Sequence, residues 1–408
     1  MKKFVMFLLV VTLCFACFGC AKKEEATPEK DAKEEAIKAD SKETEDKEKS
    51  EENNKNADGD KSAEKPDTQD SEEATRKITD AVDREVEIPD EVKKIVPLGN
   101  TPRMITYLGL AKNVVGIGEC EITDNRMHAY AYVNKEIWQD LPNCGTDAMG
   151  ETAYYPEEII LADPDVILCT YTSDVADDIQ TKTGIPTVSV PQGTLFGEDY
   201  EVALRMLGDV CGVSERAEEI ISFINNSLED LKTRTQDIPD DTKPAVLAAG
   251  ATFKGSHSID GVYTNYSVFK TLSAKDVAVN LAGQTGSSGV MVDKEQILEW
   301  DPDMIFFDAG SMELVRTDYK DNPDYFKQLK AVQNGELYQW PNSTWHWSNV
   351  EIPIVSTYYT GQLLYPDEFS DVNFEEKASE IFEFFLGDAD YLSKLEEAGS
   401  GYSKVTLE

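Results

Sequence analysis

The chain has 408 residues and a formal net charge of −39. At about 150 residues per domain, this length predicts two or three folded units. So large a negative charge argues against nucleic acid as a partner, because its phosphates would be repelled.

Cysteine usage argues against a structural zinc site. Of the seven cysteines, three cluster near the N-terminus, and the others are Cys120, Cys144, Cys169 and Cys211. The two CxxC spacings, at 14–17 and 17–20, both lie in the N-terminal cluster, and the other four cysteines show no CxxC or Cys/His ligand spacing. Cys120 and Cys144 could form a disulfide in an oxidising compartment, but we expect buried free thiols.

The N-terminus is typical of an exported protein. Two lysines precede an apolar run that is too short to span a membrane, so residues 1–19 are predicted to be a signal peptide. Residues 17–20 read Cys-Phe-Gly-Cys, which resembles a bacterial lipoprotein signal with Cys20 as the lipidated residue. Ordinary secretory cleavage without a lipid is the alternative. Two acyl chains on Cys20 would give a stable membrane anchor.

The next segment, residues 20–75, is rich in Glu, Lys, Asp and Ser and has almost no aliphatic residues. Such a segment buries no core, so it is predicted to be a disordered acidic tether behind the lipidated residue. Its expected role is to hold the folded part away from the membrane. An interaction tail is the alternative, although charge runs are usually only solvated.

Globular composition begins at residue 76. A short hairpin is predicted at 78–89, then a strand at 94–98, a helix from Thr101 and a strand at 114–116. Strand, helix and strand at this spacing predict a parallel sheet. Ligands bind at the carboxyl ends of strands in such sheets, where the turn before Thr101 lies.

An internal repeat predicts two similar lobes. Residues 157–168 (EEIILADPDVIL) match residues 295–306 (EQILEWDPDMIF). Each copy predicts a short helix, a Pro-Asp turn that ends it, and a buried strand. Glu157 and Glu295 hold the same place in the two copies.

A long amphipathic helix is predicted between the copies, at residues 213–236. Isoleucines and leucines recur there at helical spacing, Ser214 could cap the start, and Gly212 ends the preceding helix. About 20 residues at a 1.5 Å rise give a rod of about 30 Å. We therefore predict an α/β protein with two similar Rossmann-like lobes, residues 76–212 and 237–408, with mostly parallel sheets joined by this helix.

The second lobe has fewer local signals. Strands are predicted at 245–249 and 337–340, and each precedes a polar loop. Helices are predicted up to Leu364 and, as the last element, at 374–386.

These features together resemble the extracytoplasmic solute-binding proteins of ABC importers, in the class for ferric siderophores, haem and vitamin B12. The similarity covers residues 78–386, and its marks are Ile78-Thr79-Asp80-Ala81 with Asp83-Arg84-Glu85-Val86, Tyr155-Pro156-Glu157-Glu158-Ile159-Ile160, Leu207-Gly208, Glu295-Gln296-Ile297-Leu298 and the two Pro-Asp turns. The tail from Asn349-Val350-Glu351-Ile352 to Leu364-Tyr365-Pro366 is similar to a subgroup that includes oxyanion and iron-chelate binders.

The resemblance implies a ligand held between two lobes that close modestly, because a helix has few soft torsions. It also implies that Glu157 and Glu295 pair with arginines of the permease. Symmetry supports this role, since similarly placed carboxylates can engage two copies of one subunit. The alternative is that both are first-turn glutamates favoured by the helix dipole, worth about 0.3–1 kcal/mol each.

Ligand-binding candidates are the polar and aromatic residues at strand ends in both lobes. They are Asn100, Thr101, Arg103, Tyr171, Lys254, His257, Trp345, His346 and Trp347, with Thr170 and the segment 143–149 as further candidates. Arg103 and Lys254 could pair with anionic groups, and the aromatic residues could stack on a planar ligand. The alternatives are that Arg103 and Lys254 are only solvated surface cations and that the tryptophans pack in the core.

The three histidines, His128, His257 and His346, could hold a bare metal, but they are not at helical ligand spacing. One His or Tyr could instead be an axial haem ligand. We therefore expect no metal site and no resident cofactor.

The expected protein is a non-enzymatic, monomeric receptor at the outer face of the bacterial cytoplasmic membrane. It would capture a small metal chelate, most simply a ferric siderophore, and deliver it to an ABC permease dimer. Haem, cobalamin and a molybdate-like oxyanion are alternative ligands. A metal chelatase and an adhesive lipoprotein are alternative classes, although no nucleophile–base or phosphate-loop motif occurs.

Overall fold

The computed structural model describes residues 74–147, 152–283, 288–342 and 349–408, which belong to one compact unit. The predicted signal peptide, Cys20 and nearly all of the tether lie outside the described residues, as do Trp345, His346 and Trp347. Within those ranges, no helix combines the length and apolarity needed to cross a membrane.

The N-terminal lobe is an α/β structure. Its strands and helices are β1 (Thr75–Thr79), β2 (Glu85–Pro89), β3 (Ile95–Pro97), α1 (Thr101–Tyr107), β4 (Ile117–Gly118), α2 (Ala129–Tyr132), α3 (Lys135–Trp138), β5 (Asn143–Thr146), β6 (Ala153–Tyr154), α4 (Pro156–Ala162), β7 (Val166–Cys169), α5 (Ser173–Thr183), β8 (Thr187–Ser189) and α6 (Glu198–Val210). Strands β3, β7 and β8 are parallel, and β4 runs parallel to β5. A parallel bridge between Ile95 and Val114 links the two sets. The strand predicted at 114–116 was placed too early, because β4 begins only at Ile117.

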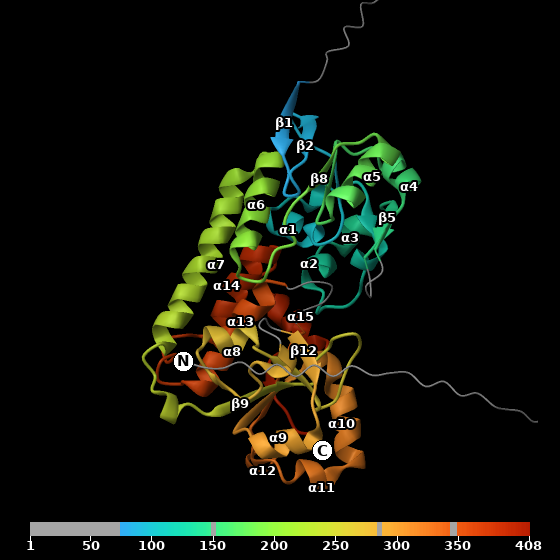
Figure 1. Ribbon diagram of the computed structural model, residues 1–408. Coiled ribbons are helices and arrows are strands. Elements are labelled where there is room, and N and C mark those ends of the chain that lie inside the picture. The colour runs from blue at the N-terminus through green and yellow to red at the C-terminus, as the bar shows by residue number, and fades with distance from the viewer. Residues whose placement is uncertain (1–73, 148–151, 284–287, 343–348) are drawn as a thin grey trace, which may run out of the picture. The chain divides into compact units, whose positions relative to one another are not determined.

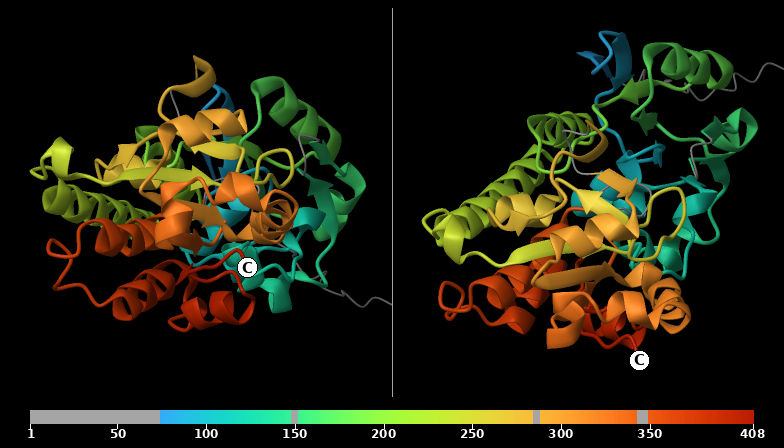
Figure 2. Two further views of the ribbon diagram at one scale, coloured as in Figure 1. Left: turned by 90° about the horizontal axis from the view of Figure 1, so that it is seen from below. Right: turned by 60° about the horizontal axis from the view of Figure 1, so that its bottom comes forward.

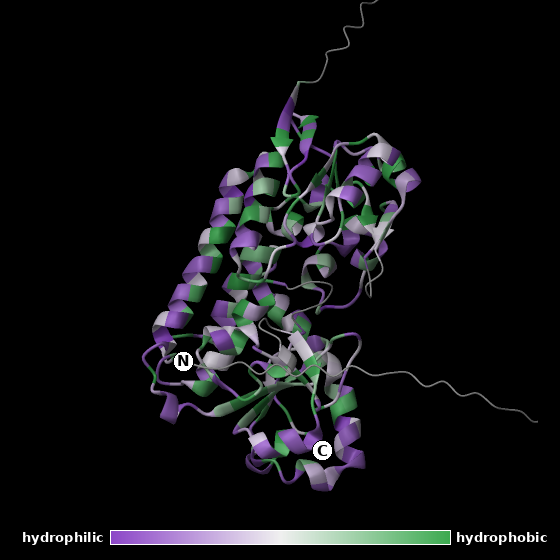
Figure 3. Ribbon diagram, viewed as in Figure 1, coloured by the Kyte–Doolittle hydropathy of each residue, from purple (hydrophilic) through white to green (hydrophobic). Residues whose placement is uncertain are grey.

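The predicted connecting helix is α7 (Ser214–Thr235), which packs against α6 in one lobe and against α8 and α13 in the other (Figure 1). Its buried face includes Ile220, Ile221, Ile224 and Leu231, at the spacing seen in the sequence. Figure 3 shows hydrophilic and hydrophobic residues alternating along this helix. Ser214 does not cap it, because Ser214 is already the first helical residue and Val213 is the N-cap.

The C-terminal lobe has a seven-stranded mixed sheet. Its elements are β9 (Ala245–Ala249), β10 (Gly261–Thr264), α8 (Ser267–Thr271), β11 (Lys275–Asp276), β12 (Ser288–Met291), α9 (Lys294–Trp300), β13 (Met304–Asp308), α10 (Met312–Asp321), α11 (Pro323–Phe326), α12 (Lys330–Asn334), β14 (Leu337–Trp340), α13 (Glu351–Leu364), α14 (Phe374–Leu386), α15 (Tyr391–Glu397) and β15 (Ser403–Lys404). The central strands β9, β13 and β14 are parallel, whereas β10, β12 and β15 pair antiparallel at the edges.

The sequence predicted helix 374–386, which is α14, as the last element, but the chain continues beyond it in regular structure. Helix α15 follows and packs on α14, and β15 then returns to pair with β14 (Figure 2). Helix α13 is buried on nearly all sides, from Glu351 to Leu364. One hydrophobic cluster joins α1 and α6 of the first lobe to α13 and α14, so the two lobes share core packing.

The repeat is confirmed down to the backbone. Helices α4 and α9 hold the same place in their lobes, and each ends at an aspartate in the left-handed conformation, Asp163 (φ 48°) and Asp301 (φ 39°). Strands β7 and β13 follow, and both are fully buried. The duplicated Pro-Asp turn therefore shapes both lobes alike.

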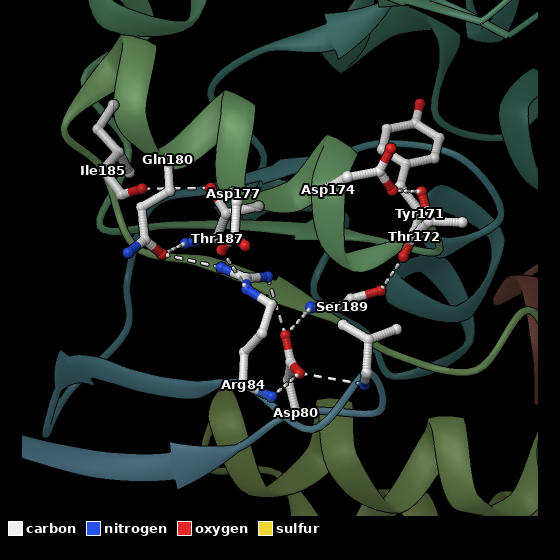
Figure 4. Close-up of polar contacts among 11 residues, drawn as sticks. Asp80, Arg84, Tyr171, Thr172, Asp174, Asp177, Gln180, Ile185, Thr187 and Ser189 are labelled. Atoms are coloured by element: carbon white, nitrogen blue, oxygen red, sulfur yellow. Dashed lines mark hydrogen bonds and ion pairs between the residues drawn. The ribbon is translucent and has the colours of Figure 1, made fainter.

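A polar cluster, here called the hairpin clasp, fastens the β1–β2 turn to the N-terminal lobe (Figure 4). It consists of Asp80, Arg84, Asp177, Gln180 and Ser189. The buried Asp80 carboxylate accepts hydrogen bonds from the backbone amides of Arg84 (3.0 Å) and Ser189 (3.2 Å) and pairs with the Arg84 guanidinium at 3.0 Å. Arg84 also reaches Asp177 (2.7 Å) and Gln180 (3.2 Å) on α5.

Candidate functional site

The first half of the candidate site is the turn between β3 and α1. Gly99 has a φ of +64°, and a Cβ there would lie 2.4 Å from the Thr170 hydroxyl oxygen, so only glycine fits. The backbone N–H of Asn100 donates to that hydroxyl at 3.2 Å, and the side-chain amide of Asn100 donates to the Gln192 carbonyl. The ends of β3, β7 and β8 are thereby joined at one edge of the sheet.

A small hollow lies at this edge. It is lined by Pro97, Leu98, Gly99, Pro102, Gly118, Cys120, Glu121, Gly145, Thr146, Asp147 and Tyr171. Its free volume of about 10 Å³ leaves room for about one water molecule, so a larger ligand would lie over its mouth. Burial raises the pKa of Tyr171, which keeps the phenol protonated as a hydrogen-bond donor.

The cysteines of the N-terminal lobe are free thiols, as predicted. Burial, reinforced by Glu121, raises the pKa of Cys120 to about 12. Burial likewise raises the pKa of Cys144 to about 12. Neither is therefore a thiolate at neutral pH.

The second half of the site is the corresponding edge of the C-terminal sheet, centred on Asp308 at the end of β13. This fully buried carboxylate accepts hydrogen bonds from the hydroxyls of Tyr263 (2.8 Å) and Thr252 (2.9 Å) and from the Asn342 side chain (3.0 Å). The Gly310 backbone amide donates to its other oxygen at 2.8 Å. Asp308 thus fixes the residues that follow β9 and β14 relative to one another.

Burial raises the pKa of Asp308 from 3.8 to about 6, which predicts a pH-dependent stability. Between pH 7 and pH 5 the folded state takes up this proton while the unfolded carboxyl stays mostly ionised, so acidification stabilises the fold. Between pH 7 and pH 5, the free energy of unfolding of the wild type should rise by about 1 kcal/mol more than that of Asp308→Asn, which has no carboxyl to titrate. Urea unfolding at both pH values measures the difference, and equal pH slopes for the two proteins would contradict it.

The loop after β9 positions two predicted ligand contacts. Lys254 is exposed and adopts a φ of 50°. His257 Nε2 lies 2.9 Å from the carbonyl oxygen of Phe253, and the rings of His257 and Phe253 are 4.3 Å apart. The histidine is thus held within its own loop, while the lysine residue is exposed.

The second edge contacts the N-terminal lobe. The backbone amide of Asn342, just after β14, lies 3.5 Å from the sulfur of Met127 in the N-terminal lobe. The Asp308 network therefore lies where the two lobes meet, and the family resemblance implies a ligand between the lobes.

Three other predicted residues are buried at the start of α1. Asn100, Thr101 and Arg103 are at most 2% exposed. The Thr101 hydroxyl lies 2.9 Å from the Leu98 carbonyl oxygen, and Arg103 Nε donates to Asn349 Oδ1 at 3.0 Å. In this conformation their side chains bind protein groups.

The histidines are not brought together within the described residues. His128 is buried in the N-terminal lobe, with Nε2 3.2 Å from Glu121 Oε2, whereas His257 lies in a C-terminal loop and His346 is outside the described ranges. Among the residues that the structure describes, no group of three or more His, Cys, Asp or Glu side chains is arranged to hold a metal ion.

Glu157 and Glu295 both lie in the first turn of a helix, α4 and α9 respectively, and both are exposed. The repeat thus places two equivalent carboxylates on the surfaces of two similar lobes.

Sequence reasoning missed the residues that organise the second half of the site. Asp308 ends the buried run Met304–Asp308, and a charged residue closing such a strand was the available signal. Asn342 was visible only as part of a polar loop. Its pairing with Asp308, 34 positions away, is long-range.

The sequence matches the family model described as periplasmic binding protein over residues 100–344. With the two-lobed fold, this match shows that the chain belongs to that family, and it is a substrate-binding protein of the ABC-transporter kind. The family predicted from the sequence is confirmed.

Particular relatives include two curated proteins. The uncharacterized ABC transporter substrate-binding lipoprotein YvrC of Bacillus subtilis is 25% identical over 266 residues, covering 64% of this chain and 76% of YvrC. The molybdate-binding protein MolA of Haemophilus influenzae is 21% identical over 336 residues, covering 76% of this chain and 91% of MolA.

Solved structures confirm the fold. A periplasmic solute binding protein from Veillonella parvula aligns with a TM-score of 0.58 and 23% identity, covering 77% of this chain and 93% of that one. The TroA-like protein FepB from the same species aligns with a TM-score of 0.55 and 19% identity, covering 76% and 96%. At such identities these structures show the fold alone.

Proposed function

We propose that the protein is a lipid-anchored receptor that captures an iron chelate, most simply a ferric siderophore, and delivers it to an ABC permease dimer. Cys20 would hold it at the outer face of the bacterial cytoplasmic membrane. The observation that supports capture is that each lobe has a polar strand-end edge, with Tyr171 in one and the Asp308 network in the other, and that the second edge contacts Met127 of the first lobe.

The chemistry of Tyr171 and Lys254 supports an anionic chelate. Tyr171 offers a phenol at the mouth of the hollow, and Lys254 offers a solvent-facing ammonium on the opposite lobe. An ammonium pairs with carboxylate or catecholate oxygens, and an aromatic ring stacks on a planar ligand. Trp345, His346 and Trp347 are further proposed contacts, and they lie outside the described residues.

A second candidate ligand is a molybdate-like oxyanion. The relative MolA is named for molybdate binding and aligns over 91% of its length. Lys254 would suit an oxyanion as well as a chelate, because both carry negatively charged oxygens. Haem and cobalamin complete the set of ligands to be compared.

Titration of the purified full-length protein tests this proposal. Tryptophan fluorescence should fall saturably with a ferric siderophore at a Kd of about 1 µM or below, a free energy of about −8 kcal/mol. Iron-free siderophore, haem, cobalamin, molybdate and tungstate are run in parallel, with calorimetry for the ligands that do not absorb. Binding of molybdate alone would support the second candidate, and no binding at all would contradict a receptor role.

Substitution of Lys254 tests the anionic character of the ligand. Lys254→Ala should weaken binding about tenfold, because one charge-assisted contact contributes about 1.4 kcal/mol. Lys270→Ala removes an equally exposed ammonium at the end of α8 and should leave the affinity unchanged. Equal affinities for wild type and Lys254→Ala would exclude the lysine from the site.

A further inference from the structure

Helix α1 of the N-terminal lobe is joined to the start of α13 in the C-terminal lobe by buried polar contacts. The Arg103 guanidinium donates through Nε to Asn349 Oδ1 at 3.0 Å and through Nη1 to Asn100 Oδ1. One turn further along α1, the Tyr107 hydroxyl donates to Glu351 and lies 3.3 Å from the Val350 amide. We call Arg103, Tyr107, Asn349 and Glu351 the interlobe junction.

All four junction side chains are at most 1% exposed. The Arg103 guanidinium also lies 4.6 Å from the ring centroid of Tyr130, which holds it from the other side. Burial raises the pKa of the Glu351 carboxyl. The hydrogen bond from Tyr107 and the positive charge of Arg103 act in the opposite direction and partly offset this rise. Buried polar groups of this kind are costly to separate, because each would lose its partner without reaching water.

The connecting helix adds a second tie at the same place. Arg216 of α7 donates to the Tyr107 carbonyl at 3.1 Å and to the Phe384 carbonyl of α14 at 2.5 Å. The rings of Tyr107 and Phe385 meet edge to face at 5.1 Å. The end of α1 is therefore fixed to α7, α13 and α14 together.

We propose that Arg103 is a positioning residue of the interlobe junction and sets the spacing of the two strand-end edges. It acts on ligand binding, as assigned under the proposed function, through Asn100 on one lobe and Asn349 on the other. Asn100 belongs to the turn that holds Gly99 against Thr170, beside Tyr171. Arg103 binds Asn349 from the N-terminal lobe, whereas Asp308 binds Asn342 within the C-terminal lobe.

Interlobe distances test the junction without any ligand. Spin labels are introduced by clickable amino acids at the exposed Lys112 and Lys320, one in each lobe of the full-length protein. Wild type should give one narrow distance distribution. Asn349→Leu and Arg103→Met should broaden it, and Asn349→Asp should restore it, because the acceptor for Arg103 Nε is retained.

A matched control removes a side-chain hydrogen bond within one lobe. Asn113→Leu abolishes a 2.9 Å bond from Asn113 Nδ2 to the Lys93 carbonyl and should leave the distribution narrow. If Asn349→Leu does not fold, Tyr107→Phe removes only the hydroxyl that bonds Glu351 and should broaden the distribution to a smaller degree. Narrow distributions in all folded junction variants would overturn the proposal.

Affinity for the ferric siderophore separates positioning from direct contact. Positioning predicts that Arg103→Met and Asn349→Leu each weaken binding about tenfold and that the double variant is no weaker than either single variant. Direct contact predicts a loss for Arg103→Met alone, with unchanged distances, and this result would overturn the proposal. If no ligand binds, the proposed function fails, while the distance measurement still decides the role of the junction.

Discussion

Reversing two charges, Glu157→Arg together with Glu295→Arg, is expected to abolish uptake while ligand affinity stays unchanged. Both carboxylates are exposed in the first turns of α4 and α9, at equivalent places in the repeat. If they pair with permease arginines, as the family resemblance implies, each reversal turns an attraction into a repulsion. Two such changes should lower uptake by about 100-fold or more.

The control introduces the same two charge reversals at neighbouring positions of the same helices. Glu158→Arg with Glu299→Arg alters exposed glutamates on the same two helices, and uptake should be nearly normal. An arginine in the first turn also opposes the helix dipole by about 1 kcal/mol, so thermal unfolding of both double variants is measured. Equal uptake by the two double variants would show that docking does not depend on Glu157 and Glu295.

The sequence predicted elements well where burial is decided locally. Strands 245–249 and 337–340 and helix 374–386 have the same bounds in the structure. The strands are short and mostly apolar, and the helix has apolar residues at helical spacing and ends before Gly387 in the left-handed conformation. The antiparallel edge strands and α15 were missed, because their position depends on pairing with distant segments.

The candidate site was predicted only in part, for a related reason. The repeat predicted that Glu157 and Glu295 hold equivalent places, and their docking role, which the family resemblance implies, stays a prediction. The strand-end rule led to Asn100 and Arg103, but Arg103 contacts Asn349, 246 positions away in the chain. No local pattern distinguishes an arginine that faces a ligand from one that joins two lobes.

The hairpin clasp explains physically why Asp80 and Arg84 occur in the first of the segments that carry the family resemblance. Removing the Asp80 carboxylate is expected to cause a large loss of stability. Asp80→Ala should lower the free energy of unfolding by about 3–5 kcal/mol. It leaves the backbone amides of Val82, Arg84 and Ser189 without their acceptor and the Arg84 guanidinium without its buried partner. Urea unfolding measures this change.

The matched control removes the other carboxylate that pairs with Arg84. Asp177 lies 2.7 Å from Arg84 Nε, but its side chain is 61% exposed, whereas that of Asp80 is fully buried. Asp177→Ala should therefore cost less than about 1 kcal/mol. Similar losses for the two variants would mean that the buried amide contacts of Asp80 contribute little.

Ser189 extends the effect of the clasp toward the site, since its hydroxyl donates to the Tyr171 carbonyl at 2.5 Å (Figure 4). Asp80→Ala should thus weaken ligand binding even under conditions where the variant stays folded, whereas Asp177→Ala should not. If folded Asp80→Ala binds the ligand with unchanged affinity, the clasp only fixes the β1–β2 turn and does not affect the site.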